Sequence, residues 1–242
     1  RVHAGGLAGT LGKNVVLDGI ESSVSVGAQT RFASLYLGGV FGLCSSSVEA
    51  WCDAEYDGVY NDISGVTYGT NASVIAGCFA RVVENASING VMIDGQHSLV
   101  VANALGAVSG SAIAGGFAGV INVCKPSFKE VSDARPVIIK DVSIIAESDY
   151  SVNAVINNCD STRKAEINPD DFTTTSAGAV AGGIAGVVYR SEKINDDAVT
   201  LTFSEITFSR SNARNDEANE RLAVNASTKD AASSGAVYAG GA

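Results

Sequence analysis

Short runs of alternating apolar and polar residues, separated by paired glycines, recur along the whole chain. The apolar positions are mostly Val, Ile and Ala, and β-branched residues of this kind are typical of strands. Runs of this length and period predict half-buried strands. Helical periodicity over ten or more residues is scarce, and its best candidate, residues 216–224, is better interpreted as a loop. The pattern therefore predicts an all-β chain.

A glycine motif repeats at intervals typical of repeat proteins. Copies occupy residues 4–9, 37–42, 76–80, 114–119 and 181–186, and residues 239–242 begin another. A degenerate copy is assigned to residues 154–159, which align with 119–124. With Tyr150 as the start of that unit, successive units begin roughly 33, 39, 38, 35 and 32 residues apart. Because glycines permit turns and close backbone approach, we expect these segments to stack on one another.

A second motif follows the glycine motif in most units. It consists of an apolar residue, any residue, Gly, Asp or Glu, and then Val or Ile, and it occurs at residues 63–68, 88–93, 139–144 and 203–208, with a weaker form at 17–20. Each copy predicts a short strand interrupted by a turn or bulge residue. Its distance from the glycine motif varies, and we assign the difference to loops. Residues 125–136, which include Pro126 and Pro136, form the clearest projecting loop.

Stacking of equivalent strands explains the choice of residue types. An inward position must suit identical neighbours in the units above and below, and Val, Ile and Ala meet that requirement. We therefore predict a right-handed parallel β-helix, or β-solenoid, with projecting loops. It is expected to span residues 1–242 as a single domain that is a fragment of a longer repeat protein.

The alternation of Gly-Gly-apolar-x-Gly with a Val/Ile-x-apolar strand resembles the GLUG-type glycine repeat of bacterial and archaeal surface proteins. It is more loosely similar to the passengers of autotransporters and filamentous adhesins. The resemblance covers most of residues 4–208, although this chain has Ala where the motif often has Val, and its loops are longer. It implies a parallel β-helix on an extracellular adhesin, and it supports the fold more than the function.

Composition and charge exclude several classes of protein. With 46% hydrophobic and 17% charged residues, the chain is suited to forming a large core. A formal net charge of −10 with scattered Lys and Arg argues against binding nucleic acid. Residues 99–124 contain no charge, but their many glycines and two asparagines make a poor apolar helix. We therefore expect no membrane span.

Catalytic and cofactor-binding motifs are scarce. Gly12-Lys13 is followed by asparagine, so there is no P-loop, and the glycine motifs lack the aspartates of a calcium-binding nonapeptide repeat. We expect no cofactor and no metal site. The only histidines are His3 and His97, and the latter follows a predicted turn. Asp196 and Asp197 lie in an acidic segment that we interpret as solvated loop charge. The alternative is a carbohydrate-active β-helix enzyme, a glycoside hydrolase or a polysaccharide lyase.

Five cysteines leave two pairings open. Cys44 and Cys52 flank a short loop, and Cys124 and Cys159 occupy aligned repeat positions, so either pair is a candidate disulfide. Buried thiols are the alternative for all four. Cys78 replaces a glycine in its repeat, and we expect it to be the unpaired member in the core.

Three Asn-Ala-Ser sequons begin at Asn71, Asn85 and Asn225 and are candidate N-glycosylation sites. They permit a glycosylated exterior, whereas the repeats, the acidity and the scarcity of catalytic residues favour a secreted or cell-surface glycoprotein, non-catalytic, with a structural or adhesive role. The expected partners are other copies of the chain joined end to end, or more repeats of a longer solenoid, and glycans or proteins of the cell surface or matrix. Both ends lie in glycine motifs, which should expose strand edges, and residues 212–221 are the alternative cap.

Overall fold

The computed structural model describes residues 1–11, 23–44, 48–49, 62–84, 86–94, 99–106, 110–124, 136–146, 151–157, 178–190, 200–210, 223–228 and 236–240. Every regular element in these segments is a β-strand, and every strand pair is parallel. No helix in the described part of the chain is long and apolar enough to cross a membrane. The predicted all-β class, with parallel stacked strands, is confirmed.

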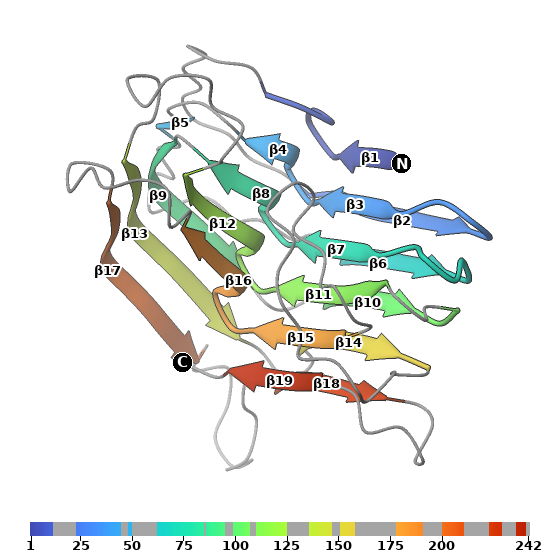
Figure 1. The fold of residues 1–242 in the computed structure, drawn as a ribbon. Coiled ribbons are helices and arrows are strands. Elements are labelled where there is room, and N and C mark those ends of the chain that lie inside the picture. Colours follow the sequence, from blue (N-terminus) through green and yellow to red (C-terminus); the bar gives the residue numbers. More distant parts are fainter. Residues whose placement is uncertain are drawn as a thin grey trace.

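The strands form four sheets, numbered here by their order within one repeat, starting from β2 (Figure 1). Sheet I contains β2 (Ser25–Thr30), β6 (Asp62–Thr67), β10 (Leu99–Ala104), β14 (Ser151–Ile156) and β18 (Ala223–Thr228). Sheet II contains β1 (Val2–Gly5), β3 (Leu35–Gly38), β7 (Val74–Gly77), β11 (Ser111–Gly115), β15 (Gly178–Gly182) and β19 (Ala236–Gly240). Sheet III contains β4 (Phe41–Cys44), β8 (Ala80–Glu84), β12 (Ala118–Cys124) and β16 (Ala185–Arg190). Sheet IV contains β5 (Val48–Glu49), β9 (Ser87–Asp94), β13 (Val137–Ala146) and β17 (Leu201–Arg210).

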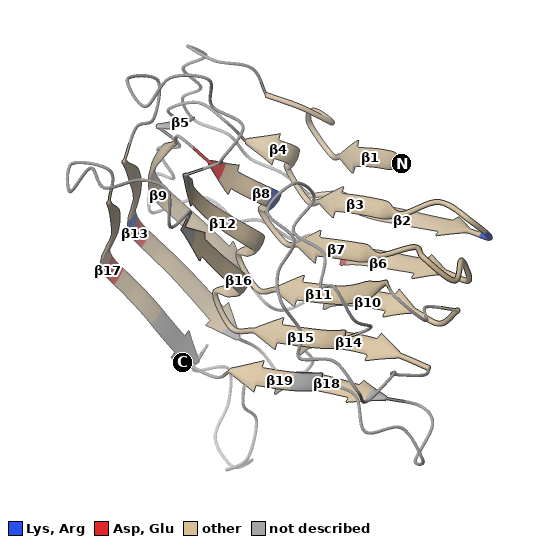
Figure 2. Cartoon of the chain, viewed as in Figure 1, with Lys and Arg blue, Asp and Glu red and all other residues tan. Residues whose placement is uncertain are grey.

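Each repeat of the chain adds one strand to every sheet. A strand of sheet I is followed by strands of sheets II, III and IV, and the next strand returns to sheet I one layer further along. In Figure 1 these layers descend from the N-terminal strand β1 to the C-terminal strands β18 and β19. Acidic and basic residues are sparse along the described strands (Figure 2). The sheets are therefore held mainly by apolar packing and by the backbone ladders between layers.

A column of glycines runs down sheet II. Gly38, Gly77 and Gly115 pair in register, with Gly5 above them and Gly182 and Gly240 below. A Cβ on Gly77 would lie 2.1 Å from the carbonyl oxygen of Ala80 and 2.5 Å from the backbone nitrogen of Gly119. Only a residue without a side chain lets sheet II pass this close to sheet III. The predicted stacking of the glycine motifs is confirmed.

The degenerate copy assigned to residues 154–159 is wrong. Gly115 pairs directly with Gly182, so one long repeat occupies the interval that the sequence pattern divided into two. Residues 151–156 form β14 in sheet I, where Ala154 pairs with Ala102 and not with a residue of sheet III. The motif assignment failed because alternating strands of sheets I and III have the same apolar pattern.

The second motif occupies two different sheets. Its copies at Ile88, Ile139 and Phe203 stack in sheet IV, whereas the copy at Ile63 lies in sheet I against Val100. In sheet IV the third residue of the motif has a left-handed backbone, with φ of 73°, 52° and 56° at Gly90, Asp141 and Glu205. At the corresponding place in sheet I, Gly65 provides space: a Cβ there would lie 2.6 Å from a methyl of Val74.

The interior is filled by columns of apolar side chains from the four sheets. Sheets I and II face each other across it, since side-chain carbons of Leu37 and Leu35 lie 2.9 and 3.7 Å from the place that a Cβ on Gly65 would take. At the turn into sheet III, Phe79 and Phe117 stack with ring centroids 4.9 Å apart and 5° between the planes. Each ring thus packs on the equivalent side chain of the next layer.

A second apolar cluster lies on the outer faces of sheets II and III. Tyr36, Ile75 and Ile113 form a column in sheet II that alternates with the interior positions, and Val82 and Val120 do the same in sheet III. All five residues are at most 2% exposed. We call this cluster the outer seam. The two sheets are therefore packed on both faces over the middle layers.

The predicted loop at residues 125–136 lies almost entirely outside the described residues. It connects β12, which ends at Cys124, with β13, which begins at Val137, and the one described residue, Pro136, is exposed. The projection of this loop stays a prediction. The proposed cap at residues 212–221 also lies outside the described part of the chain.

Candidate functional site

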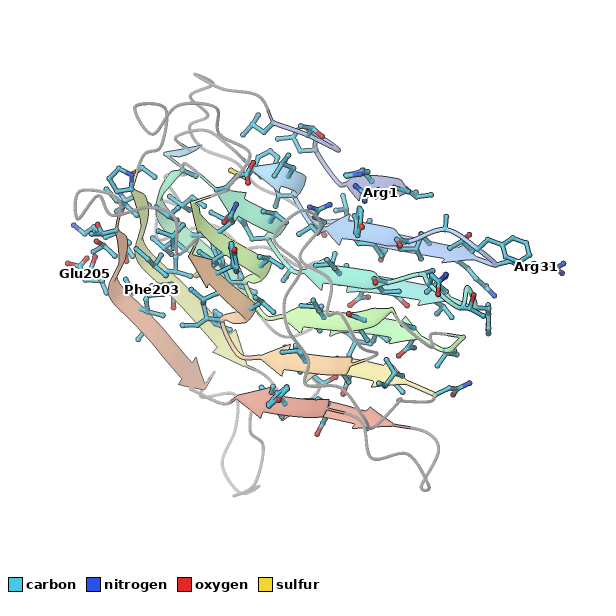
Figure 3. All side chains as sticks on the ribbon, in the orientation of Figure 1. Arg1, Arg31, Phe203 and Glu205 are labelled. Carbon is cyan, nitrogen blue, oxygen red and sulfur yellow. The ribbon has the colours of Figure 1, made fainter. Side chains whose placement is uncertain are left out.

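The turns that connect sheet I to sheet II carry two exposed aromatic side chains, and one of them, Phe32, is the most exposed large hydrophobic side chain of the described residues. Phe32, in the turn after β2, is 87% exposed, and Tyr68, directly after β6, is 49% exposed. Arg31 precedes Phe32 and extends from the same tip (Figure 3). Asn71 follows in the turn after β6 and is exposed. We call these four residues the turn edge.

Two threonines fix the backbone of the first two turns. Thr30 Oγ1 accepts a hydrogen bond from the backbone nitrogen of Ala33 at 3.2 Å. Thr67, at the same register position in the next layer, is fully buried; its hydroxyl donates to the carbonyl of Ala33 at 3.0 Å and accepts from the nitrogen of Gly69 at 3.3 Å. Hydroxyl side chains commonly stabilise turns in this way. The aromatic side chains are therefore displayed on an ordered backbone.

Successive turns also contact each other directly. The backbone nitrogen of Tyr68 donates to the carbonyl of Thr30 at 3.2 Å. A Cβ on Gly69 would lie 2.9 Å from the carbonyl oxygen of Phe32, so glycine is needed for this approach. The turn after β10 continues the stack, because a Cβ on Gly106 would overlap the carbonyl oxygen of Tyr68. The first three turns between sheets I and II thus lie directly against one another, and the turn edge occupies the first two of them.

The chemistry of the turn edge suits binding. Aromatic rings and guanidinium groups are the side chains that contribute most at protein interfaces, and aromatic faces also pack against apolar faces of ligands. Arg31 adds a donor for carboxylate or hydroxyl groups, and its turn contains no acidic residue. Phe32 and Tyr68 lie on adjoining turns, so their exposed apolar surface is grouped, and grouped apolar surface is typical of an interaction site. Neither the apolar pattern nor the motifs of the sequence indicated the turn edge.

The candidate glycosylation sites fall in different places. Asn71 belongs to the turn edge, and Asn225 lies exposed in β18, where its Nδ2 donates to Oδ1 of Asn153 at 3.0 Å. Asn85 lies outside the described residues. An amide nitrogen keeps one hydrogen after it is glycosylated, so the Asn225 bond is compatible with a glycan. Glycosylation at all three stays a prediction.

The cysteines are only partly described. Cys44 and Cys78 are fully buried in the interior. Cys52 and Cys159 lie outside the described residues, so both candidate disulfides stay predictions. The alignment that suggested pairing Cys124 with Cys159 does not hold, because the strand before Cys159 belongs to sheet I and Cys124 ends a strand of sheet III.

Ionisable residues on the outer seam form a small group that the sequence did not indicate. The guanidinium of Arg81 lies 4.2 Å from the ring centroid of Tyr36, and Nδ2 of Asn122 donates to the carboxylate of Glu84 at 3.0 Å. Partial burial, followed by the positive charge of Arg81, lowers the pKa of His3, whose ring meets that of Tyr36 edge-on at 5.0 Å. These contacts stabilise the packing of the sheets. None of them places a carboxylic acid beside a basic group at an exposed surface.

Comparison with protein-family models, curated proteins and solved structures finds no match to this chain. The residues considered for catalysis, Asp196, Asp197 and His97, lie outside the described part of the chain. Within the described residues, no group of three or more His, Cys, Asp or Glu side chains is placed to hold a metal ion. The turn edge is therefore the site on which a functional proposal can be based.

Proposed function

We propose that this chain is a right-handed parallel β-solenoid module of a secreted or cell-surface protein, with a structural and adhesive role. Parallel crossovers are right-handed in about 98% of known cases, which supports the handedness. The stacked parallel sheets and the paired glycines support the solenoid. The sequons at Asn71 and Asn225, both exposed, support an extracellular location.

The observation that carries the adhesive role is the exposure of Phe32 on a hydrogen-bonded turn beside Arg31 and Tyr68. A rigid stack displays these groups without an ordering cost at the moment of binding, which favours affinity. The ligand class that fits is a cell-surface or matrix glycan or protein that offers an apolar face beside a hydrogen-bond acceptor. The module holds its ligand and does not transform it.

The test compares binding with cleavage. The chain, labelled with a fluorophore, is applied to cells, to matrix proteins and to a glycan array, while release of reducing sugar is measured on the same glycans. We expect binding without sugar release. The double variant Phe32→Ser with Tyr68→Ser should weaken binding at least tenfold, because central aromatic contacts commonly contribute more than about 1.4 kcal/mol.

The matched control is the double variant Asp196→Asn with Asp197→Asn, which should bind like the parent chain. Far-UV circular dichroism verifies that both double variants keep their strands, as expected since Phe32 and Tyr68 lie outside the core. Sugar release that disappears in the aspartate variant would overturn the proposal in favour of a carbohydrate-active enzyme. Unchanged binding in the aromatic variant would show that the turn edge is not the binding site.

A further inference from the structure

The outer face of sheet I continues into the turns that lead to sheet II. Along β2, β6 and β10, more exposed residues alternate with more buried ones, so every second side chain faces outward. The last outward position of these strands is occupied by Gln29, Val66 and Asn103, which are register partners. Their side chains therefore form a row across three layers of the stack.

The next outward positions form a second row just beyond the strand ends. The backbone nitrogen of Tyr68 donates to the carbonyl of Thr30 at 3.2 Å, and that of Leu105 donates to the carbonyl of Thr67 at 2.8 Å. The ladder thus extends past the strands, and it keeps Arg31, Tyr68 and Leu105 at equivalent places. Together the two rows cover roughly 10 Å along the stack and 7 Å along the strands. We call these side chains the platform.

Among the basic side chains that the structure describes, Arg31 alone has no partner. No hydrogen bond, ion pair or ring contact joins its exposed guanidinium to a described residue, and it extends past the end of β2 (Figure 3). The others are Arg1 and Arg81, which lie over the ring of Tyr36, and Lys140, which lies 3.7 Å from Glu205. A guanidinium without a partner keeps all its donors available to a ligand.

The charges around the platform favour an anion. The single acidic residue of the described sheet I strands is Asp62, at the opposite end of β6, where its carboxylate accepts the backbone nitrogen of Leu99 at 3.3 Å. About 20 Å of extended chain separates Asp62 from Tyr68. On a chain with a formal net charge of −10, the platform is therefore a local site of positive potential. Carboxylate and sulfate groups are the usual partners of a guanidinium.

The other side chains of the platform suit a sugar better than a protein surface. The ring of Tyr68 is 49% exposed, and Val66 and Leu105 beside it are half-buried. Gln29, and Thr70 in the adjoining turn, are exposed and offer amide and hydroxyl groups to a hydroxyl-rich ligand. A protein partner buries about 800 Å² on each side of a stable interface, which is far more than the platform provides.

We propose that the platform, where the turn edge meets the outer face of sheet I, binds an anionic glycan. The apolar face of a sugar ring packs on Tyr68, and a carboxylate or sulfate group of that sugar or its neighbour accepts hydrogen bonds from Arg31. Adjacent strands lie about 4.8 Å apart, so one or two sugar units reach both side chains. This inference rests on the proposed adhesive role of the turn edge and specifies the class of ligand.

The test uses three tetrasaccharides with the same rings and linkages: cellotetraose, its derivative oxidised to a carboxylate at each C6, and its derivative sulfated at each O6. Calorimetric titration measures their affinities for the whole chain. We expect at least one acidic form to bind at least tenfold more tightly than cellotetraose, since hydrogen bonds to charged groups are strong. Added salt should weaken the acidic form selectively. The two acidic derivatives distinguish a carboxylate from a sulfate as the preferred group.

Arg31→Gln should remove the preference for the acidic form and leave the affinity for cellotetraose unchanged. The matched control is Lys140→Gln, which removes the same charge from an exposed side chain of sheet IV and should keep the preference. Tyr68→Ser should weaken the binding of all three tetrasaccharides, because each offers the same ring to the aromatic face. Far-UV circular dichroism verifies that the variants keep their strands, as expected for exposed side chains.

Equal affinity for the acidic and neutral forms, or no binding of any of them, would overturn the proposal. A glutamate-rich peptide that binds through Arg31 while the sugars do not would also overturn it, because the ligand would then be an acidic protein segment. Adhesion to cells that Phe32→Ser with Tyr68→Ser weakens and Arg31→Gln leaves unchanged would contradict this inference alone. Adhesion that the aromatic variant leaves unchanged would contradict the proposed binding site itself.

Discussion

The glycine column of sheet II gives a sharp test of the packing between sheets II and III. Replacing Gly115 by alanine would place a Cβ 1.7 Å from the carbonyl oxygen of Ala118 and 2.8 Å from the backbone nitrogen of Gly186. Gly240 occupies the same register position two layers on, and its Cβ would contact nothing within 4 Å. The variants Gly115→Ala and Gly240→Ala therefore each add a Cβ at equivalent positions of the same column. The two positions differ in the atoms that surround that Cβ.

The expected magnitude follows from which atoms are displaced. Overpacking a core costs about 1–3 kcal/mol when side chains can adjust, and more when they cannot. Both atoms that crowd Gly115 are backbone atoms of hydrogen-bonded strands, so we expect a loss of at least about 3 kcal/mol in the free energy of unfolding. At Gly240, alanine restricts the unfolded chain and should change stability by no more than about 1 kcal/mol, with stabilisation the expected sign.

Thermal unfolding followed by far-UV circular dichroism measures both variants. For a chain of this size, 1 kcal/mol corresponds to about 2–4 °C in Tm, so Gly115→Ala should lower Tm by about 6 °C or more. Gly240→Ala should stay within about 4 °C of the parent chain. Equal shifts for the two variants would refute the reasoning, because they would mean that the next strand of sheet III does not constrain the column.

Three further predictions concern the core, the backbone and a titrating group. Phe79→Ala should lower the free energy of unfolding by about 3–5 kcal/mol in urea titration, because it opens a void between stacked rings. Glu205→Gly should raise the free energy of unfolding by about 0.5 kcal/mol, because φ is 56° at Glu205. Lys140→Ala removes the exposed ion pair with Glu205 at 3.7 Å and should change the free energy of unfolding little. In NMR titration, His3 should show a pKa below 6.5 that rises in Arg81→Gln. Because the folded pKa is lowered, His3 stabilises the fold above pH 6.5, and this contribution falls as pH decreases toward the folded pKa.

Sequence patterns predicted best those features in which the structure accepts only one type of residue. Paired glycines were assigned to stacked segments because only glycine permits the contact at Gly77 and Gly115, and the register confirms those assignments. The parallel strands followed from the same repetition. The count of repeats was wrong after Gly115, since the long interval before Gly182 contains a sheet I strand whose alternation is indistinguishable from that of a sheet III strand.

The candidate sites depended on information that one-dimensional patterns do not contain. Phe32 has the same apolar character as a core phenylalanine such as Phe117, and only the turn that carries it makes it exposed. Val188 and Phe203 are part of ordinary strand motifs, and they are exposed because no described strand covers them. Pattern analysis identifies which side of a strand faces inward, but it does not identify which inward positions lack a covering layer.

The buried pair of Glu84 and Asn122 affects which strands of these near-identical repeats pair with one another during folding. Asn122 is fully buried and Glu84 is 9% exposed, and their hydrogen bond joins β8 to β12. If β8 skipped a layer during folding and paired with β16, the carboxylate of Glu84 would meet the ring of Tyr189, which pairs with Asn122 in the native register. Loss of a charged hydrogen bond in a buried place costs about 1–3 kcal/mol, a penalty that the apolar columns alone do not impose. The pair thus favours the native pairing of β8 with β12 over the pairing of β8 with β16 while the chain folds.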